Sequence, residues 1–479
     1  MNLLGKTAGF LVGLLLVAIY CGFEAATGEP VARREEDPTP PTTIGALPSA
    51  NRFPKALGVA GCAGQACHGN GERSIGPLHL AELADAGTDD SWQSSYFRWH
   101  NLDRHARAWE TLKNPRSQNI EHRLTDGKSR DATADSRCLA CHANPTLATR
   151  DDAAAQKLHR DGVGCESCHG NAEKWRDQHV EWQPKAPRDR LYADVQMTEL
   201  HDLGVRAETC VGCHVGAPAS GDFPLRDVNH DLIAAGHPRL NFELTTYLRM
   251  MPPHWKEKDR ALAGHPARLP GYEAQVWLVG QAACAEASLN LLASRAQTTR
   301  WPELAEFNCA SCHHQLRPAG LGRPSTGSLL WNSPLLMEPA PGDNQILQAA
   351  RATAEVRDLM LRGKPAAVGE AARSAAAAWG EMRREFAAAP PNDATIQSAL
   401  GLLRLQALDP PDWDQAARLY YGLVAIENAK RHLRGAGAEA ADPRVEIRLE
   451  NLHRLLRTRR ESEPFEWERV REELRKWSK

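Results

Sequence analysis

The chain has 479 residues and a formal net charge of −2. That length has room for two or three domains. The nearly balanced charge excludes the strongly basic surface that nucleic-acid-binding proteins use, so we expect no nucleic-acid partner. Histidine (19) and cysteine (12) are abundant, whereas methionine is scarce (7).

The N-terminus reads as a targeting segment. An apolar run at 8–23 follows a lysine, which fits an export signal, and the run is marginal for a membrane span of about 20 residues. We predict that 1–26 is a signal peptide or an N-terminal anchor, which would attach the protein to the inner membrane. A lipoprotein site at Cys21 is disfavoured because a bulky residue precedes it. Residues 27–54, rich in Pro, Thr, Glu and Arg, are predicted to be a linker without a core.

Four copies of the string Cys-x-x-Cys-His follow, and a stretched copy precedes them. In chain order the strings are Cys62/Cys67/His68, Cys138/Cys141/His142, Cys165/Cys168/His169, Cys210/Cys213/His214 and Cys309/Cys312/His313. The string is typical of covalent haem c attachment, in which two thiols bond the porphyrin and the histidine binds the iron. A structural zinc site would not need a histidine after every second cysteine. For the stretched copy, a disulfide between Cys62 and Cys67 is the alternative. We therefore predict five haem c groups, four of them on the complete string.

Each iron needs a second axial ligand, which histidine can supply and methionine mostly cannot. The predicted proximal ligands are His68, His142, His169, His214 and His313. The predicted distal ligands are His105, His179, His230 and His237; His201, His254, His100 and His314 are weaker candidates. His230 and His237 are nearly two helical turns apart, a spacing that could serve two neighbouring haems. Ligation by two histidines gives lower potentials than ligation by histidine and methionine, so we expect low-potential haems.

Basic side chains near these strings have two interpretations. Arg137, Lys174, Arg206 and Arg239 could bind haem propionates, since Arg forks suit carboxylates, or could be solvated charges.

Residues 55–316 hold every string and form the predicted haem domain. With few aromatic residues (6% of the chain), this segment should consist of short helices and loops around the apolar faces of the haems. A long helix with an apolar stripe is predicted at 272–298. Cys284 within it is expected to be a buried, inert thiol.

The rest of the chain contains no cysteine. A Gly/Pro/Ser-rich linker is predicted at 317–343, followed by an all-α domain at 344–479. Its predicted helices cover 344–362, 365–387, 393–407, 412–434, 443–458 and 464–478. We expect this domain to pack against the haem domain as a cover rather than to have a separate activity. The fold class is thus mainly α.

Several strings resemble the cytochrome c-554 family. They are Tyr96-x-x-Trp99 with His105-Ala-Arg-Ala-Trp-Glu-Thr-Leu112, Gly162-Val-Gly-Cys165-Glu-Ser-Cys168-His169-Gly-x-Ala-Glu-Lys-Trp175, Asn229-His230-Asp-x-Ile-Ala-Ala-Gly-His237-Pro-Arg-Leu240, and Phe307-Asn-Cys309-x-x-Cys312-His313-His314. The resemblance covers roughly residues 55–315. It implies a mostly helical fold, haems in closely stacked pairs and electron transfer. In the founding case hydroxylamine oxidoreductase is the donor and one haem lacks a distal ligand. This chain departs from the pattern by a fifth string and a helical extension, so that donor does not transfer safely.

Two functions follow from these patterns. The first is a periplasmic electron carrier with redox proteins as donor and acceptor. The alternative is an enzyme that oxidises or reduces a small nitrogen or sulfur compound at a five-coordinate haem. Pentahaem nitrite reductases typically carry Cys-x-x-Cys-Lys at the catalytic haem, and this chain has no such string. The surplus of candidate distal histidines favours the carrier, and no catalytic residue is predicted.

Overall fold

The computed structural model describes residues 54–70, 91–180, 192, 196–252, 254, 272–299, 301–307, 312–313, 344–408, 413–433, 443–456 and 467–477. The predicted signal or anchor, both predicted linkers apart from Pro54, and Cys21, Cys309 and His314 lie outside the described residues. The chain divides into two compact units, Met1–Arg52 and Phe53–Lys479, and every described residue belongs to the second.

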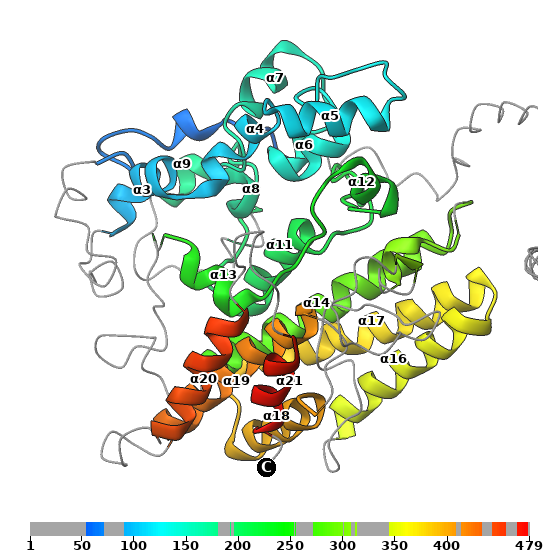
Figure 1. Cartoon of the computed structure of the whole chain (residues 1–479). Coiled ribbons are helices and arrows are strands. Elements are labelled where there is room, and N and C mark those ends of the chain that lie inside the picture. The colour runs from blue at the N-terminus through cyan, green and yellow to red at the C-terminus, as the bar shows by residue number, and fades with distance from the viewer. Residues whose placement is uncertain are drawn as a thin grey trace, which may run out of the picture. The chain divides into compact units, whose positions relative to one another are not determined.

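The protein is mainly α, as predicted (Figure 1). Up to residue 306 the described helices are short, with one exception, α14. They are η1 (Val59–Gly61), η3 (Ser91–Ser94), α3 (Ser95–Leu102), η4 (Arg104–Arg107), α4 (Ala108–Thr111), α5 (Pro115–Leu124), α6 (Ser136–His142), η5 (Pro145–Leu147), α7 (Ala153–His159), α8 (Cys165–His169), α9 (Arg176–His179), α11 (Leu203–His214), α12 (His230–Ala235), α13 (Leu244–Met250), α14 (Tyr272–Arg295) and η8 (Leu304–Glu306). Extended pairing within the described residues is limited to two isolated bridges in the loop that joins α11 to α12.

The C-terminal helices are longer and match their predicted ranges closely. They are α16 (Asn344–Arg362), α17 (Pro365–Ala388), α18 (Asp393–Gln406), α19 (Trp413–Leu433), α20 (Pro443–Leu456) and α21 (Trp467–Arg475). Pro365 stands at the first position of α17, where its missing N–H costs nothing. Trp379 of α17 is fully buried, and its indole N–H donates to Thr353 of α16 at 3.0 Å, which fixes these two helices against each other.

Helix α14 is the central element of the fold. It contacts α11 and α13 on one side and α17 and α19 on the other (Figure 1). The predicted apolar stripe is an underestimate, because even Gln275 and Gln281 are buried. By length and composition α14 could cross a membrane, but 83% of its most apolar 18-residue window is buried inside the protein. A helix that is apolar all round is buried on all sides, and here the C-terminal helices cover the side that faces away from the strings.

The apolar core lies mostly at this junction. One large cluster joins α11, α13 and α14 to all six C-terminal helices. Cys284 belongs to this cluster, 1% exposed, and burial raises its thiol pKa to about 12, so it is inert as expected. Between residues 91 and 180 the clusters are small, built around Leu139 and Trp175. This segment therefore has little aliphatic core of its own.

Candidate functional site

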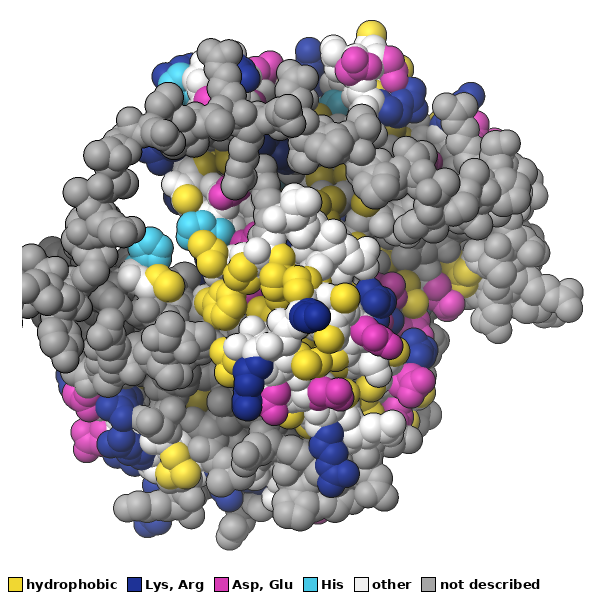
Figure 2. Space-filling model, turned by 90° about the vertical axis from the view of Figure 1, so that its right-hand side faces the viewer, with side chains coloured by type: hydrophobic (Ala, Val, Ile, Leu, Met, Phe, Trp, Pro, Cys, Tyr) yellow, Lys and Arg dark blue, Asp and Glu magenta, His cyan; other side chains and the backbone are white. Residues whose placement is uncertain are grey.

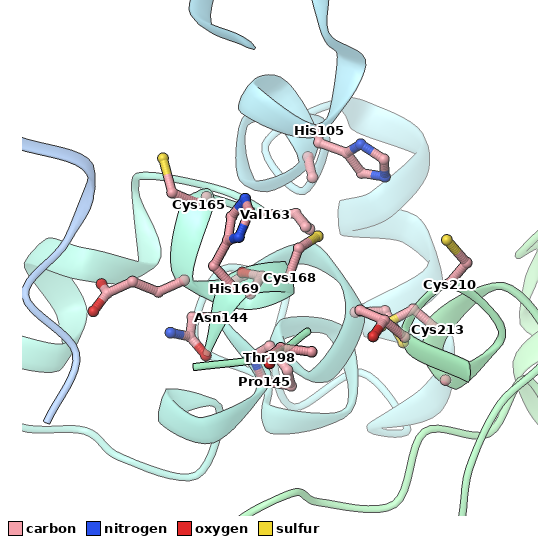
Figure 3. A pocket seen from close by; sticks show the side chains of 18 of the residues that line it. His105, Asn144, Pro145, Val163, Cys165, Cys168, His169, Thr198, Cys210 and Cys213 are labelled. Atoms are coloured by element: carbon pink, nitrogen blue, oxygen red, sulfur yellow. The ribbon is translucent and has the colours of Figure 1, made fainter. Parts of the chain in front are cut away.

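A large cavity occupies the region with little core. Its volume is about 2220 Å³, whereas a pocket for a drug-sized ligand measures about 300–1,000 Å³. The cysteines and histidine of each of the first four strings line it, and so do His105, His179, His237 and His254. Figure 3 shows Cys168 and His169 from α8, His105 from η4, and Cys210 and Cys213 from α11 around this cavity.

Five pairs of histidine rings stand at nearly equal spacing. Their ring centroids are 6.2 Å apart for His68/His179, 6.5 Å for His142/His237, 6.5 Å for His169/His254, 6.0 Å for His214/His105 and 6.3 Å for His313/His230. Each pair joins the histidine of one string to a histidine from elsewhere in the chain. Imidazole nitrogens bind metals at about 2.0–2.1 Å and lie about 1.1 Å from the ring centroid, so two rings on opposite sides of one ion are about 6.3 Å apart. The spacing of all five pairs fits one iron between each.

The backbone orients five of these ten rings through Nδ1, so Nε2 is the nitrogen that these rings would present to a metal. In each case the Nδ1–H group donates to a backbone carbonyl oxygen. The donor and acceptor residues are His68 and Trp92 (2.8 Å), His142 and Ala108 (2.9 Å), His237 and Pro238 (2.7 Å), His254 and Pro252 (3.4 Å), and His179 and Arg176. Metal-binding histidines commonly donate their other N–H in this way.

His105 differs, because its Nδ1–H donates to a carboxylate, Asp103 Oδ1, at 3.0 Å. Asp103 is 6% exposed and also accepts the backbone N–H of His105 at 3.0 Å. The hydrogen bond to Asp103 raises the pKa of His105 although burial opposes it.

Burial keeps three of the string histidines neutral, which is the form that binds a metal. It lowers the pKa of His169 to about 3 and that of His214 to about 4, and it also lowers the pKa of His142. His169 Nδ1 is buried and makes no hydrogen bond in the described part of the protein.

Local sequence explains how α12 presents its two histidines. Asn229 caps the helix by accepting the N–H of Leu232 at 2.9 Å, so His230 is the first helical residue. The helix ends at Gly236, whose positive φ of 118° suits glycine. Arg116 and Arg123 of α5 donate to the carbonyls of Gly236 and Ala235, at 2.7 Å and 3.0 Å for their shortest contacts. These contacts fix the turn that carries His237 toward His142.

The strings also contact one another. The Cys62 side chain interacts with that of Cys165, and the Cys141 side chain interacts with that of Cys213. Glu166, 6% exposed between the two cysteines of the third string, accepts the backbone N–H groups of Leu57, Gly58 and Ala172 at 2.7–3.0 Å. The first string therefore lies against the third, and the second lies against the fourth.

The remaining candidates have the following places. Of the weaker distal candidates, His254 faces His169, His201 lines the cavity without belonging to one of the five pairs, and His100 stacks on Tyr96. Sequence reasoning undervalued His254, which lies far from any string and follows two prolines with no local signal of its role. In the founding case of the resembled family one haem lacks a distal ligand, whereas here each of the five string histidines faces a second histidine ring.

The basic candidates divide similarly. Arg137 and Arg206 line the cavity, whereas Lys174 and Arg239 are not among its described lining residues. Arg137 also pairs with Asp135 and lies 3.5 Å from Glu121 Oε2. Cys62 and Cys67 are both free thiols, so the structure does not contain the alternative disulfide.

Thiol pairs beside paired imidazoles, in a helical fold with a large cavity, define a c-type cytochrome, a class that carries covalently bound haem and transfers electrons. Residues 91–170 match the family model described as "Cytochrome c554 and c-prime". That match confirms the suspected family resemblance over this segment, and redox proteins are the partners that the family implies. Comparison with curated proteins and with solved structures found no match.

Proposed function

We propose that the protein is a periplasmic pentahaem cytochrome c that carries electrons between redox proteins. The observation that carries the proposal is the set of five histidine pairs, each 6.0–6.5 Å between ring centroids. Haem c supplies an iron that takes up and releases single electrons. The role of this chain is to bind, orient and shield the five groups.

The proximal and distal residues would occupy both axial positions of each iron. Beyond the predicted ligands, this assigns His254 as the distal ligand opposite His169. A saturated iron has no position for a substrate, which disfavours the alternative enzyme. Ligation by two histidines, with no methionine in any of the five pairs, favours low potentials.

The contacts between strings support close spacing of the groups. The proximity of these cysteines supports a first porphyrin site beside the third and a second beside the fourth. His230 and His237 lie at opposite ends of one short helix, so the fifth pair adjoins the second. The fifth pair is more open, because Cys312 and His313 are exposed. On the face in Figure 2, histidine side chains reach the surface next to hydrophobic ones.

Export to the periplasm rests on the apolar run at 8–23 together with the strings, since c-type haem is attached on the outer side of the bacterial inner membrane. Whether the signal is cleaved decides between a free protein and one attached to the membrane.

Two measurements on the purified, exported protein test the proposal. Intact mass should show five haems and report N-terminal processing. The dithionite-reduced protein should bind no carbon monoxide, and the ferric protein should give only low-spin electron paramagnetic resonance (EPR) signals. Four haems would remove the Cys62/Cys67 site. A high-spin signal that shifts with nitric oxide or nitrite would favour the enzyme instead.

A further inference from the structure

A buried ionic cluster lies beside the fifth histidine pair. Arg295, the last residue of α14, bonds both oxygens of Asp227, with Nε at 3.1 Å from Oδ2 and Nη2 on Oδ1. Its other terminal nitrogen, Nη1, donates to Glu306 Oε1. The three side chains are 11%, 9% and 5% exposed. One guanidinium thus joins two carboxylates that are distant from each other in the sequence.

The two carboxylates belong to the two halves of the fifth pair. Asp227 precedes His230 by three residues, and Glu306 precedes Cys309 of the fifth string by three. The segment around Glu306 also reaches His230 directly, because Glu303 Oε1 accepts the backbone N–H of His230 at 2.8 Å. The cluster therefore connects the loop that enters α12 with the loop that enters the fifth string.

Hydrophobic packing holds these two loops unequally. Trp301 and Phe307 pack against the large core, so the segment before the fifth string is anchored without Arg295. No residue of α12 or of the loop 217–229 is a described member of that core. The far end of α12 is held at Gly236 by Arg116. Loss of Arg295 should consequently loosen the His230 end of α12, where the backbone hydrogen bond to Glu303 remains, and leave His237 in place.

The buried charges make the cluster of Arg295, Asp227 and Glu306 sensitive to substitution. Burial raises the pKa of Glu306 although Arg295 favours its ionised form. Burial also opposes the charge of Arg295, but Glu306 and Asp227 outweigh it and raise the pKa of the guanidinium. Removing one partner of a buried ion pair leaves an uncompensated charge, whereas replacing the whole group by neutral side chains is often tolerated. A variant that removes one charge and a variant that neutralises the whole cluster therefore separate the effect on the position of His230 from the effect on the stability of the fold.

We propose that Arg295 is a positioning residue that holds His230 opposite His313 by binding Asp227 and Glu306. This inference rests on the proposed function, in which His230 and His313 are the axial ligands of the fifth haem. Arg295 would thus position the ligand of one iron, and its loss should leave the other four histidine pairs unaffected.

The test counts carbon monoxide bound by the reduced protein and high-spin iron in the ferric protein. Wild type should bind none. Arg295→Met should bind one molecule of carbon monoxide per chain and show one high-spin haem, while still carrying five haems by mass. Arg295→Lys, which keeps the charge but loses the fork, should bind a fraction of one equivalent. The control is Lys430→Met, which removes a cation that is 17% exposed and pairs with Glu427 at 3.0 Å in α19, and it should bind none.

Two further variants keep the test decisive. His230→Ala should create the same single site; if it does not, the ligand assignment in the proposed function has failed, and this inference fails with it. Arg295→Met combined with Asp227→Asn and Glu306→Gln removes all buried charge, so it addresses the case in which Arg295→Met does not fold. That triple variant should also bind one equivalent. If it and any folded Arg295→Met protein stay fully low-spin while His230→Ala does not, Arg295 has no positioning role.

Discussion

The carboxylate behind His105 should set the potential of one haem. In three of the other pairs the orienting acceptor is a neutral backbone carbonyl, whereas Asp103 is charged and its side chain is 5% exposed. Burial opposes ionisation of Asp103, but its hydrogen bonds from His105 outweigh that effect and lower its pKa. A negative charge at this place stabilises ferric over ferrous iron. Asp103→Asn should therefore raise the midpoint potential of the haem between His105 and His214.

The size of the shift follows from the geometry. Asp103 Oδ1 lies 3.0 Å from His105 Nδ1, and the His105 and His214 ring centroids are 6.0 Å apart. The charge is then about 7 Å from the point midway between the rings, which corresponds to about 2 kcal/mol at an effective dielectric constant of about 20. For one electron, with about 59 mV per tenfold change, that is about 100 mV.

The assay is a spectroelectrochemical titration of the five proposed haems. Asn still caps η4, so the fold should be preserved. The matched control is Asp152→Asn, which changes the cap of α7 at an aspartate that bonds Ala155 and Arg150 but no histidine ring. The charge of Asp103 also acts on His254, so the neighbouring haem should shift by less. Unchanged potentials, or an equal shift of all five, would refute this reasoning.

Three other predictions follow from buried groups. His254→Ala should create one haem that binds carbon monoxide, whereas His201→Ala should create none, because His254 faces a proximal ring and His201 only lines the cavity. Equal behaviour of the two variants in a carbon monoxide titration would contradict the pairing of His254 with His169. Burial raises the pKa of Glu121 from 4.5 to about 7, so the folded protein binds the extra proton and its stability should fall as pH rises from about 4.5 to 7. Glu121→Gln should remove that fall, which is at most about 3 kcal/mol. Denaturant unfolding at pH 5 and pH 8 measures the fall, and parallel curves for the two proteins would exclude Glu121 as the cause. Trp379→Ala should lower the free energy of unfolding by about 3–5 kcal/mol, since the side chain is fully buried and bonds Thr353; a loss below 1 kcal/mol in the same assay would mean that α17 contributes little to the core.

Local chemistry determined the class of this protein. A string of five residues brings two thiols and an imidazole together by covalent spacing alone, so no tertiary information is needed to predict haem c. Helical periodicity is also local, and the ranges of α14 and of the C-terminal helices were predictable to within a few residues.

Tertiary structure decided what lies opposite each string. His169 pairs with His254 and His68 with His179, across long stretches of chain that carry no local mark of the partnership. Short polar side chains such as Asp103 and Glu166 gain their roles only from burial beside these rings and strings. In the same way the apolar stripe of α14 predicts a buried face but not its partners, which are helices far along the chain. Axial ligation and burial depend on which distant segments meet, and that is a property of packing rather than of any short stretch of sequence.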